Sequence, residues 1–251
     1  MAAVIAAAAG LWACSASKGS YYVEGIERSR IVIDSRYDKK PDKDAMTFIA
    51  PYTARVDSVM SPVVGRSARY MEVHRPESEL SNLLADILMW ASSYYGERPV
   101  FAVYNMGGIR APLPEGTVTY GDILRIAPFE NKICFLTLSG KYVLKLFENI
   151  AFVGGQGVSR GVELVIKDRK LVSARLNGEE IDPARNYRIV TIDYLAEAND
   201  QMEAFKKKNE YKSTRNEEDD MRNIIAKYFR AMEKRGEAVD ARTEGRITTG
   251  E

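Results

Sequence analysis

Asn105-Met106-Gly107-Gly108-Ile109-Arg110 is the stretch of this sequence best suited to chemistry. Two adjacent glycines leave the backbone bare between an apolar run and an arginine, so a ligand can approach the peptide groups closely. Amides in such a loop can surround an anion, and the guanidinium of Arg110 can donate two hydrogen bonds to a phosphate. The same pattern is also typical of a tight turn whose arginine faces solvent.

Two aromatic residues and a carboxylate are the next candidates. Phe129 follows Pro128 in a loop ahead of an apolar run, where core packing is the alternative role for a phenylalanine. Tyr194 and Asp200 come after a later apolar run. An aromatic ring there can stack on a base, and a carboxylate can accept hydrogen bonds from ribose hydroxyls.

Histidine and cysteine are too scarce to build a metal centre. His74 is the single histidine, whereas hydrolytic metal sites usually take several imidazoles from one chain. His74 and Arg75 precede a predicted helix, whose first amides favour anions, but a solitary histidine is commonly a plain surface residue. Cys134 lies in an apolar run, which predicts a buried and unreactive thiol. We therefore expect no metal ligand, no cofactor and no catalytic residue in this chain.

Composition points to an ordinary globular protein. The 251 residues are 45% hydrophobic and 28% charged, and the net charge of +1 provides no broad field for nucleic acid. We expect no nucleic-acid partner, and any anion must be held by local geometry.

The elements that must position these residues follow from apolar periodicity. Helical spacing begins after Ser78, a plausible cap, and continues to Tyr94. Buried strands, further helices and a solvated polar segment are expected elsewhere: strands at 100–104, 133–138, 162–166, 171–176 and 187–192, helices at 141–151 and 221–232, and the polar segment at 206–220. Asn177-Gly178 predicts a tight turn. These elements predict an α+β fold with a mixed β-sheet flanked by helices.

The amino terminus resembles a bacterial lipoprotein leader. Residues 1–11 are apolar but too few to span a bilayer core, which needs about 20. Cys14 follows Ala13 as a lipidated cysteine would, although Trp12 is unusual there and no basic residue precedes the apolar run. We expect residues 1–20 to be a signal peptide and polar tether, and 21–251 to form one domain. This predicts an extracytoplasmic protein anchored to the membrane only through lipid on Cys14; the alternative is a leader with an incidental cysteine.

Taken in order, eight stretches between about residues 56 and 247 resemble the C-terminal, substrate-binding domain of the 5′-nucleotidases, a family that includes UDP-sugar hydrolases. They are Glu77–Asp86, Asn105–Arg110, Gly116–Thr119, Pro128–Asn131, Leu138–Lys141, Ser159–Gly161, Tyr187–Thr191 and Glu244–Ile247.

The resemblance implies a mononucleotide site. It assigns nucleotide contacts to Asn105 and Arg110 of the Gly107-Gly108 loop, and a base between the rings of Phe129 and Tyr194. It assigns the contacts with the ribose hydroxyls to Asp200, which stands six residues beyond Tyr194. Arg75 stands near the place of another family arginine, shifted by about one residue.

Three departures from the family bear on function. The loop at 197–202 lacks the glycines usual around the ribose-binding aspartate, and Tyr194 replaces the usual phenylalanine. Only about 50 residues precede the matching region and they contain no histidine, so we expect this chain to lack the family's metallophosphatase domain with its two metal ions. The resemblance therefore implies the nucleotide-binding half of a split phosphoester hydrolase, paired with a separately encoded metallophosphatase that carries divalent metal. The alternatives are a lipoprotein that only binds nucleotides or nucleosides, and a structural lipoprotein whose site has decayed.

Overall fold

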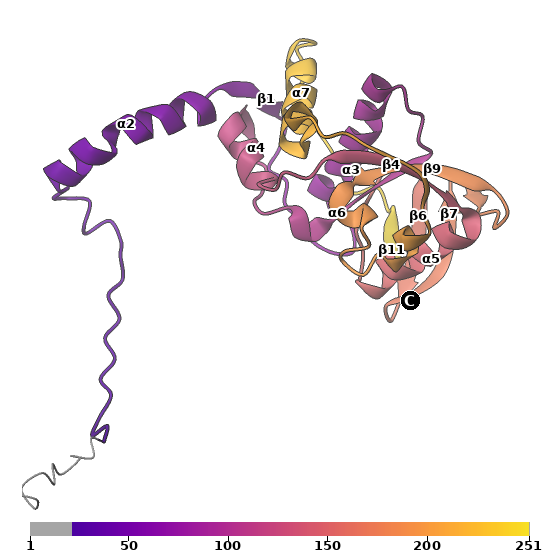
Figure 1. Ribbon diagram of the computed structural model, residues 1–251, viewed down its shortest axis with the longest axis horizontal. Helices are drawn as coiled ribbons and strands as arrows, with labels where there is room; N and C mark the ends of the chain where they lie inside the picture. The colour runs from indigo at the N-terminus through magenta and orange to yellow at the C-terminus, as the bar shows by residue number, and fades with distance from the viewer. Residues whose placement is uncertain (1–21, 251) are drawn as a thin grey trace, which may run out of the picture. The chain divides into compact units, whose positions relative to one another are not determined.

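The computed structural model describes residues 22–250 (Figure 1), so the leader and Cys14 lie outside the described residues. The chain divides into two compact units, Met1–Ile49 and Ala50–Glu251. Helix α2 (Lys43–Met60), which the sequence analysis did not predict, crosses this division and contains Pro51. Within the described part of the chain, no helix is both long and apolar enough to cross a membrane.

The central sheet has five strands in the order β10-β4-β9-β2-β5. Strand β9 lies parallel to β2 on one side and antiparallel to β4 on the other, so the sheet is mixed. All of β2 and nearly all of β4 are buried, which explains why both read as continuous apolar runs. The strand bounds are β10 Asn209–Ser213, β4 Ile133–Ser139, β9 Asn186–Ile192, β2 Phe101–Tyr104 and β5 Gly157–Val158.

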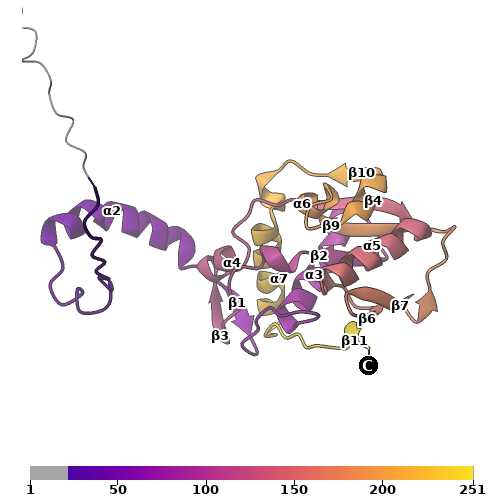
Figure 2. The same cartoon turned by 90° about the horizontal axis from the view of Figure 1, so that it is seen from below.

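A second sheet has four strands in the order β11-β6-β7-β8, and a third pairs β1 with β3 (Figure 2). Burial alternates along β6, as expected for a sheet covered on one face. Asn177 and Gly178 both have positive φ, 53° and 79°, and form the predicted tight turn after β7. The bounds are β11 Ile247–Thr249, β6 Val162–Lys167, β7 Lys170–Leu176, β8 Glu179–Glu180, β1 Val63–Ser67 and β3 Gly116–Thr119.

Helices cover the sheets and complete the core. Ser78 caps α3 (Glu79–Ser92), accepting from the amide of Ser81 at 3.3 Å, and α3 packs on β2, β5 and β9. Helix α5 (Gly140–Phe152) packs on β4 and β7, while α7 (Met221–Glu233) packs on β1 and α3. The shorter helices are α4 Tyr120–Ile126, α6 Asp193–Ala196, η2 Ser93–Tyr95, η3 Met106–Gly108, η4 Glu203–Lys207 and η5 Glu217–Asp219. The expected α+β fold, with mixed sheets flanked by helices, is confirmed.

The polar segment at 206–220 differs from its prediction in one respect. It is solvated, but residues 209–213 form the exposed strand β10, which pairs with β4 at the sheet edge. Its polar composition hid the strand because an edge strand in water shows no apolar alternation.

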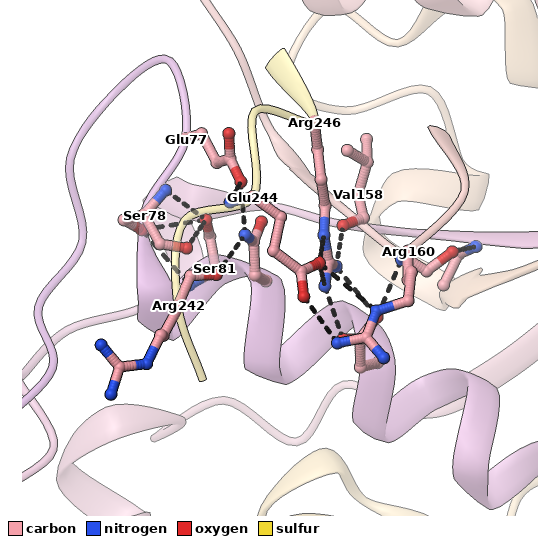
Figure 3. A network of polar contacts seen from close by, with 12 residues as sticks. Glu77, Ser78, Ser81, Val158, Arg160, Arg242, Glu244 and Arg246 are labelled. Carbon is pink, nitrogen blue, oxygen red and sulfur yellow. Dashed lines mark hydrogen bonds and ion pairs between the residues drawn. The ribbon is translucent and has the colours of Figure 1, made fainter. Parts of the chain in front are cut away.

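A polar network joins α3 to the last segment of the chain (Figure 3). The guanidinium of Arg246 is 4% exposed; it donates to Asp86 at 2.7 and 2.9 Å, to Glu244 at 2.7 Å, and to the Val158 carbonyl at 2.8 Å. The buried carboxylate of Glu77 accepts from the amide of Glu244 at 2.8 Å. We call these five residues the C-terminal clamp. It holds the start of α3 and strand β5 in place.

Candidate nucleotide-binding site

The strand order explains how distant residues meet in one cavity. Because β2 and β9 run parallel, the segments that follow both strands lie at the same end of the sheet. Strand β4 runs the other way, and Ile133 at its start pairs with Ile192 at the end of β9, so the segment before β4 lies at this end as well. A cavity of about 310 Å³ at this end of the sheet is lined by Asn105, Gly107, Gly108, Arg110, Phe129, Asn131, Tyr194 and Asp200.

The Gly107-Gly108 loop is fixed by its own amides. The amide of Met106 donates to the Gln156 side-chain oxygen at 2.7 Å, and the amide of Gly108 donates to the Asn105 carbonyl at 3.1 Å. The amide of Arg110 donates to the Ile126 carbonyl at 2.9 Å. The hypothesis of an amide cradle for an anion is therefore wrong for most of this loop. Four residues of this loop nevertheless line the cavity: Asn105, Gly107, Gly108 and Arg110.

Steric space explains the two glycines. A Cβ on Gly108 would lie 2.6 Å from the side-chain oxygen of Asn105, which is 4% exposed and has little room to move. A Cβ on Gly107 would meet the Asp200 carboxylate at 3.7 Å, an ordinary contact. Gly108 thus sets the position of the Asn105 amide.

The Gly108→Ala variant is expected to bind adenosine monophosphate on the order of tenfold more weakly, because it displaces Asn105 and breaks its hydrogen bond to Asp200. Titration calorimetry measures the change. Gly107→Ala is the matched control, with an expected loss below about threefold, since its Cβ makes only an ordinary contact. Equal losses in the two variants would contradict the steric argument.

Asp200 sits at the centre of the polar wall. One carboxylate oxygen accepts from the phenol of Tyr194 at 3.0 Å, and the other from the Asn105 amide nitrogen at 3.3 Å. The hydrogen bond to Asp200 is the main cause that raises the pKa of Tyr194, so the phenol stays protonated. A carboxylate has about four lone-pair sites and keeps capacity for further donors.

The glycine-poor loop still delivers Asp200 to the cavity. Ala198, Asp200 and Gln201 adopt left-handed backbone conformations, with φ of 66°, 51° and 63°. Glycine adopts this left-handed conformation without strain, whereas residues with a side chain adopt it at an energetic cost. The departure in sequence therefore leaves Asp200 within reach of Asn105 and Tyr194.

Both aromatic rings are accessible. Phe129 is 47% exposed and Tyr194 is 38% exposed, so core packing does not describe Phe129. Both rings line the cavity, and the described residues show no stacking contact between them. A planar group can therefore approach either ring.

Arg110 provides the positive charge of the cavity. Its guanidinium donates to the Gly107 carbonyl at 3.3 Å, is exposed, and forms no ion pair with any described carboxylate. Arg75 does not line this cavity; it borders a different hollow with Pro76 and Gly154. Burial lowers the pKa of Arg75, and the charge of Asp200 opposes that shift. Arg75 therefore lies within electrostatic range of the site without forming its wall.

Two residues that line or support the cavity were not predicted. Asn131 lines the cavity two positions after Phe129, and its carbonyl accepts from the amide of Met221 at 2.9 Å. Gln156, 1% exposed, holds the Met106 amide while its own amide nitrogen has no partner. A polar residue among the glycines of 154–157 was the available signal for Gln156.

Residues 22–250 do not offer the ligands that the two metal ions implied by the family resemblance would need. No group of three or more histidine, cysteine or acidic side chains is placed to hold a metal there. His74 has a side chain 54% exposed and lies 4.0 Å from Glu79. Cys134 is fully buried, as predicted, and burial raises the pKa of its thiol.

Known proteins resemble this chain over part of their length. The profile of the family "5′-nucleotidase, C-terminal domain" matches residues 58–207. Protein UshA of Escherichia coli is 24% identical over 163 residues, covering 63% of this chain and 30% of UshA. An apyrase of Tabanus yao is 34% identical over 146 residues, covering 49% of this chain and 26% of the apyrase. The chain thus spans less than a third of these relatives.

A solved structure agrees on the fold. The 5′-nucleotidase precursor of Thermus thermophilus superposes with a TM-score of 0.70 and 24% identity, over 82% of this chain and 43% of that one. At this identity the likeness supports the fold alone. The family profile, however, covers more than half of the chain and includes the Gly107-Gly108 loop, Phe129, Tyr194 and Asp200. The chain therefore belongs to the 5′-nucleotidase C-terminal domain family.

Proposed function

We propose that this domain is the nucleotide-binding half of a 5′-nucleotidase-type phosphoester hydrolase system in nucleotide catabolism. One observation carries the proposal: Asn105, Arg110, Phe129, Tyr194 and Asp200, from three separate segments, line a single cavity. Two accessible rings, a free cation and a carboxylate match the base, the phosphate and the sugar of a nucleotide.

Each group has one role in this proposal. Phe129 and Tyr194 bind the base by stacking, a contact tolerant of base identity. Arg110 binds phosphate through charge-assisted hydrogen bonds. Asp200, steadied by Asn105 and Tyr194, accepts from ribose hydroxyls. The domain therefore binds and orients the substrate, which lowers the entropic part of the barrier.

The chemical step is assigned to a separate metallophosphatase that holds divalent metal. The support is the residue inventory: one histidine in the whole sequence, which is exposed, and no fitting ligand group among residues 22–250. A receptor that binds nucleotides or nucleosides without any phosphatase is the second candidate, and the intact cavity is compatible with it. A structural lipoprotein with a decayed site is the third, and the accessible rings and charge argue against decay.

The purified protein is expected to bind adenosine monophosphate but not to hydrolyse it, with or without added manganese. Hydrolysis is expected to appear when a candidate metallophosphatase and divalent metal are added. Calorimetry measures binding and phosphate release measures turnover. Binding without turnover under every combination selects the receptor, absence of binding selects the decayed site, and metal-dependent turnover by this chain alone overturns the proposal.

We further propose that the protein is extracytoplasmic and held at the membrane by lipid on Cys14, which lies outside the described residues. Cys14→Ser is expected to move the protein from the membrane fraction to the soluble extracytoplasmic fraction. Fractionation with immunodetection measures this, and Cys134→Ser, at the buried thiol, is the control. Unchanged fractionation of the Cys14→Ser protein would reject the anchor.

A further inference from the structure

A second cavity, away from the nucleotide site, combines positive charge with aromatic rings. It encloses about 500 Å³ between the ends of α3 and α7 and is lined by Trp90, Tyr94, Lys227, Arg230, Ala231, Lys234 and Arg235. We call it the basic aromatic cleft. It shares no residue with the candidate nucleotide site and is not required by the proposed function.

The positive charge of the cleft is not neutralised by the protein. Arg230, Lys234 and Arg235 are exposed, and none forms an ion pair with a described carboxylate. Glu233, the acidic residue of α7, pairs instead with Arg66 at 3.1 Å. The chain as a whole has a net charge of only +1, so this charge is a local concentration. An anionic partner is its natural complement.

Helix stability explains one cation of the cleft but not its aromatic residues. The helix dipole favours cations in the last turn of a helix, which accounts for Arg230. Tyr94 is nevertheless 71% exposed, and its ring lies 5.0 Å from that of the half-buried Trp90. Trp90 in turn packs edge-on against Tyr228 at 5.1 Å, which fixes the wall beside the cations. Tryptophan and tyrosine flanked by lysine and arginine is the composition of a membrane interface.

We propose that the basic aromatic cleft binds the surface of an anionic phospholipid membrane. Long cations without fixed partners can follow mobile lipid phosphates, while the rings of Trp90 and Tyr94 lie at headgroup level. A site built for one soluble anion would instead hold its cations rigidly through buried hydrogen bonds. This contact is separate from the proposed lipid anchor and gives the domain a preferred face toward the bilayer.

The test uses the full chain carrying Cys14→Ser and Trp12→Phe, which removes lipidation and leaves Trp90 as the sole tryptophan. The protein is expected to sediment with vesicles of equal parts phosphatidylglycerol and phosphatidylcholine more than with phosphatidylcholine alone, with a blue shift of Trp90 emission. Adding Arg230→Glu and Lys234→Glu is expected to lower the partition coefficient about 25-fold or more, since losing each basic residue near an anionic surface removes a factor of about five and the anionic surface also repels each new carboxylate.

A matched control carries Lys170→Glu and Arg175→Glu, which reverse the charge of two exposed residues on β7. This strand lies apart from α7 in both views (Figures 1 and 2). It makes the same change in net charge, and its partition coefficient is expected to fall less than about threefold. Thermal unfolding checks that both double variants fold. Unchanged sedimentation of the α7 variant, or an equal loss in the β7 variant, would overturn the proposal. A Trp90 response to inorganic phosphate or glycerol phosphate without vesicle binding would also overturn it, in favour of a soluble ligand.

Discussion

Replacing Arg246 with methionine is expected to lower the free energy of unfolding by about 3 kcal/mol or more, because it leaves buried acceptors without a donor. Arg246 is 4% exposed and joins Asp86, Glu244 and the Val158 carbonyl in the C-terminal clamp. For a domain of this size the expected fall in Tm is about 6–12 °C. Denaturant titration and calorimetric Tm measure the two quantities.

Arg160→Met is the control for this prediction. Arg160 binds the same Glu244 carboxylate at 2.6 Å, but its side chain is 76% exposed, so water can replace the lost contact. Its expected cost is below about 1 kcal/mol. Similar losses for the two variants would mean that burial does not set the strength of the clamp.

The second large effect concerns ligand binding. Phe129→Ala and Tyr194→Ala are each expected to weaken binding of adenosine monophosphate about tenfold to a hundredfold, from a stacking energy of about 1–3 kcal/mol. The loss should be similar for adenosine, because both ligands carry the same base. Calorimetry with both ligands measures it, and Phe152→Ala, an exposed ring at the end of α5, is the control.

Arg110→Ala is expected to show a different ligand dependence. It should weaken binding of adenosine monophosphate about tenfold or more and leave adenosine nearly unchanged, because its guanidinium serves the phosphate. Equal losses for nucleotide and nucleoside would place Arg110 on the base or sugar instead. No loss with either ligand in any of the three variants would remove this cavity from the binding function.

The location of the candidate site could be predicted because its residues follow or precede strongly apolar strands. The runs at 100–104 and 187–192 indicated β2 and β9, and motif order supplied the roles proposed for Asn105 and Tyr194. That β2 and β9 lie side by side and parallel depends on pairing between segments far apart in the sequence, such as Phe101 with Ile189, which no local pattern encodes. Only the structure therefore shows that the segments after β2 and β9 meet at one end of the sheet.

The misses share a physical cause. The amides of the Gly107-Gly108 loop are occupied by Gln156 and by the Ile126 carbonyl, partners distant in sequence from Met106 and Arg110. Local glycine content predicts a bare backbone but cannot say whether its donors are already used. The hydrogen bond between Tyr194 and Asp200 is likewise set by left-handed residues in a loop, where side-chain identity alone favours other conformations.

The C-terminal clamp also constrains how the chain acquires its structure during synthesis. Glu77, at the start of α3, accepts from the amide of Glu244, and Arg246 holds strand β5 through Val158. Strand β11 then pairs in parallel with β6. Because the start of α3 and strand β6 are completed only by residues 244–249, a growing chain cannot close this fold until that segment has emerged from the ribosome. Its late closure prolongs the interval in which apolar strands are exposed, and makes folding slow relative to proteins with local contacts.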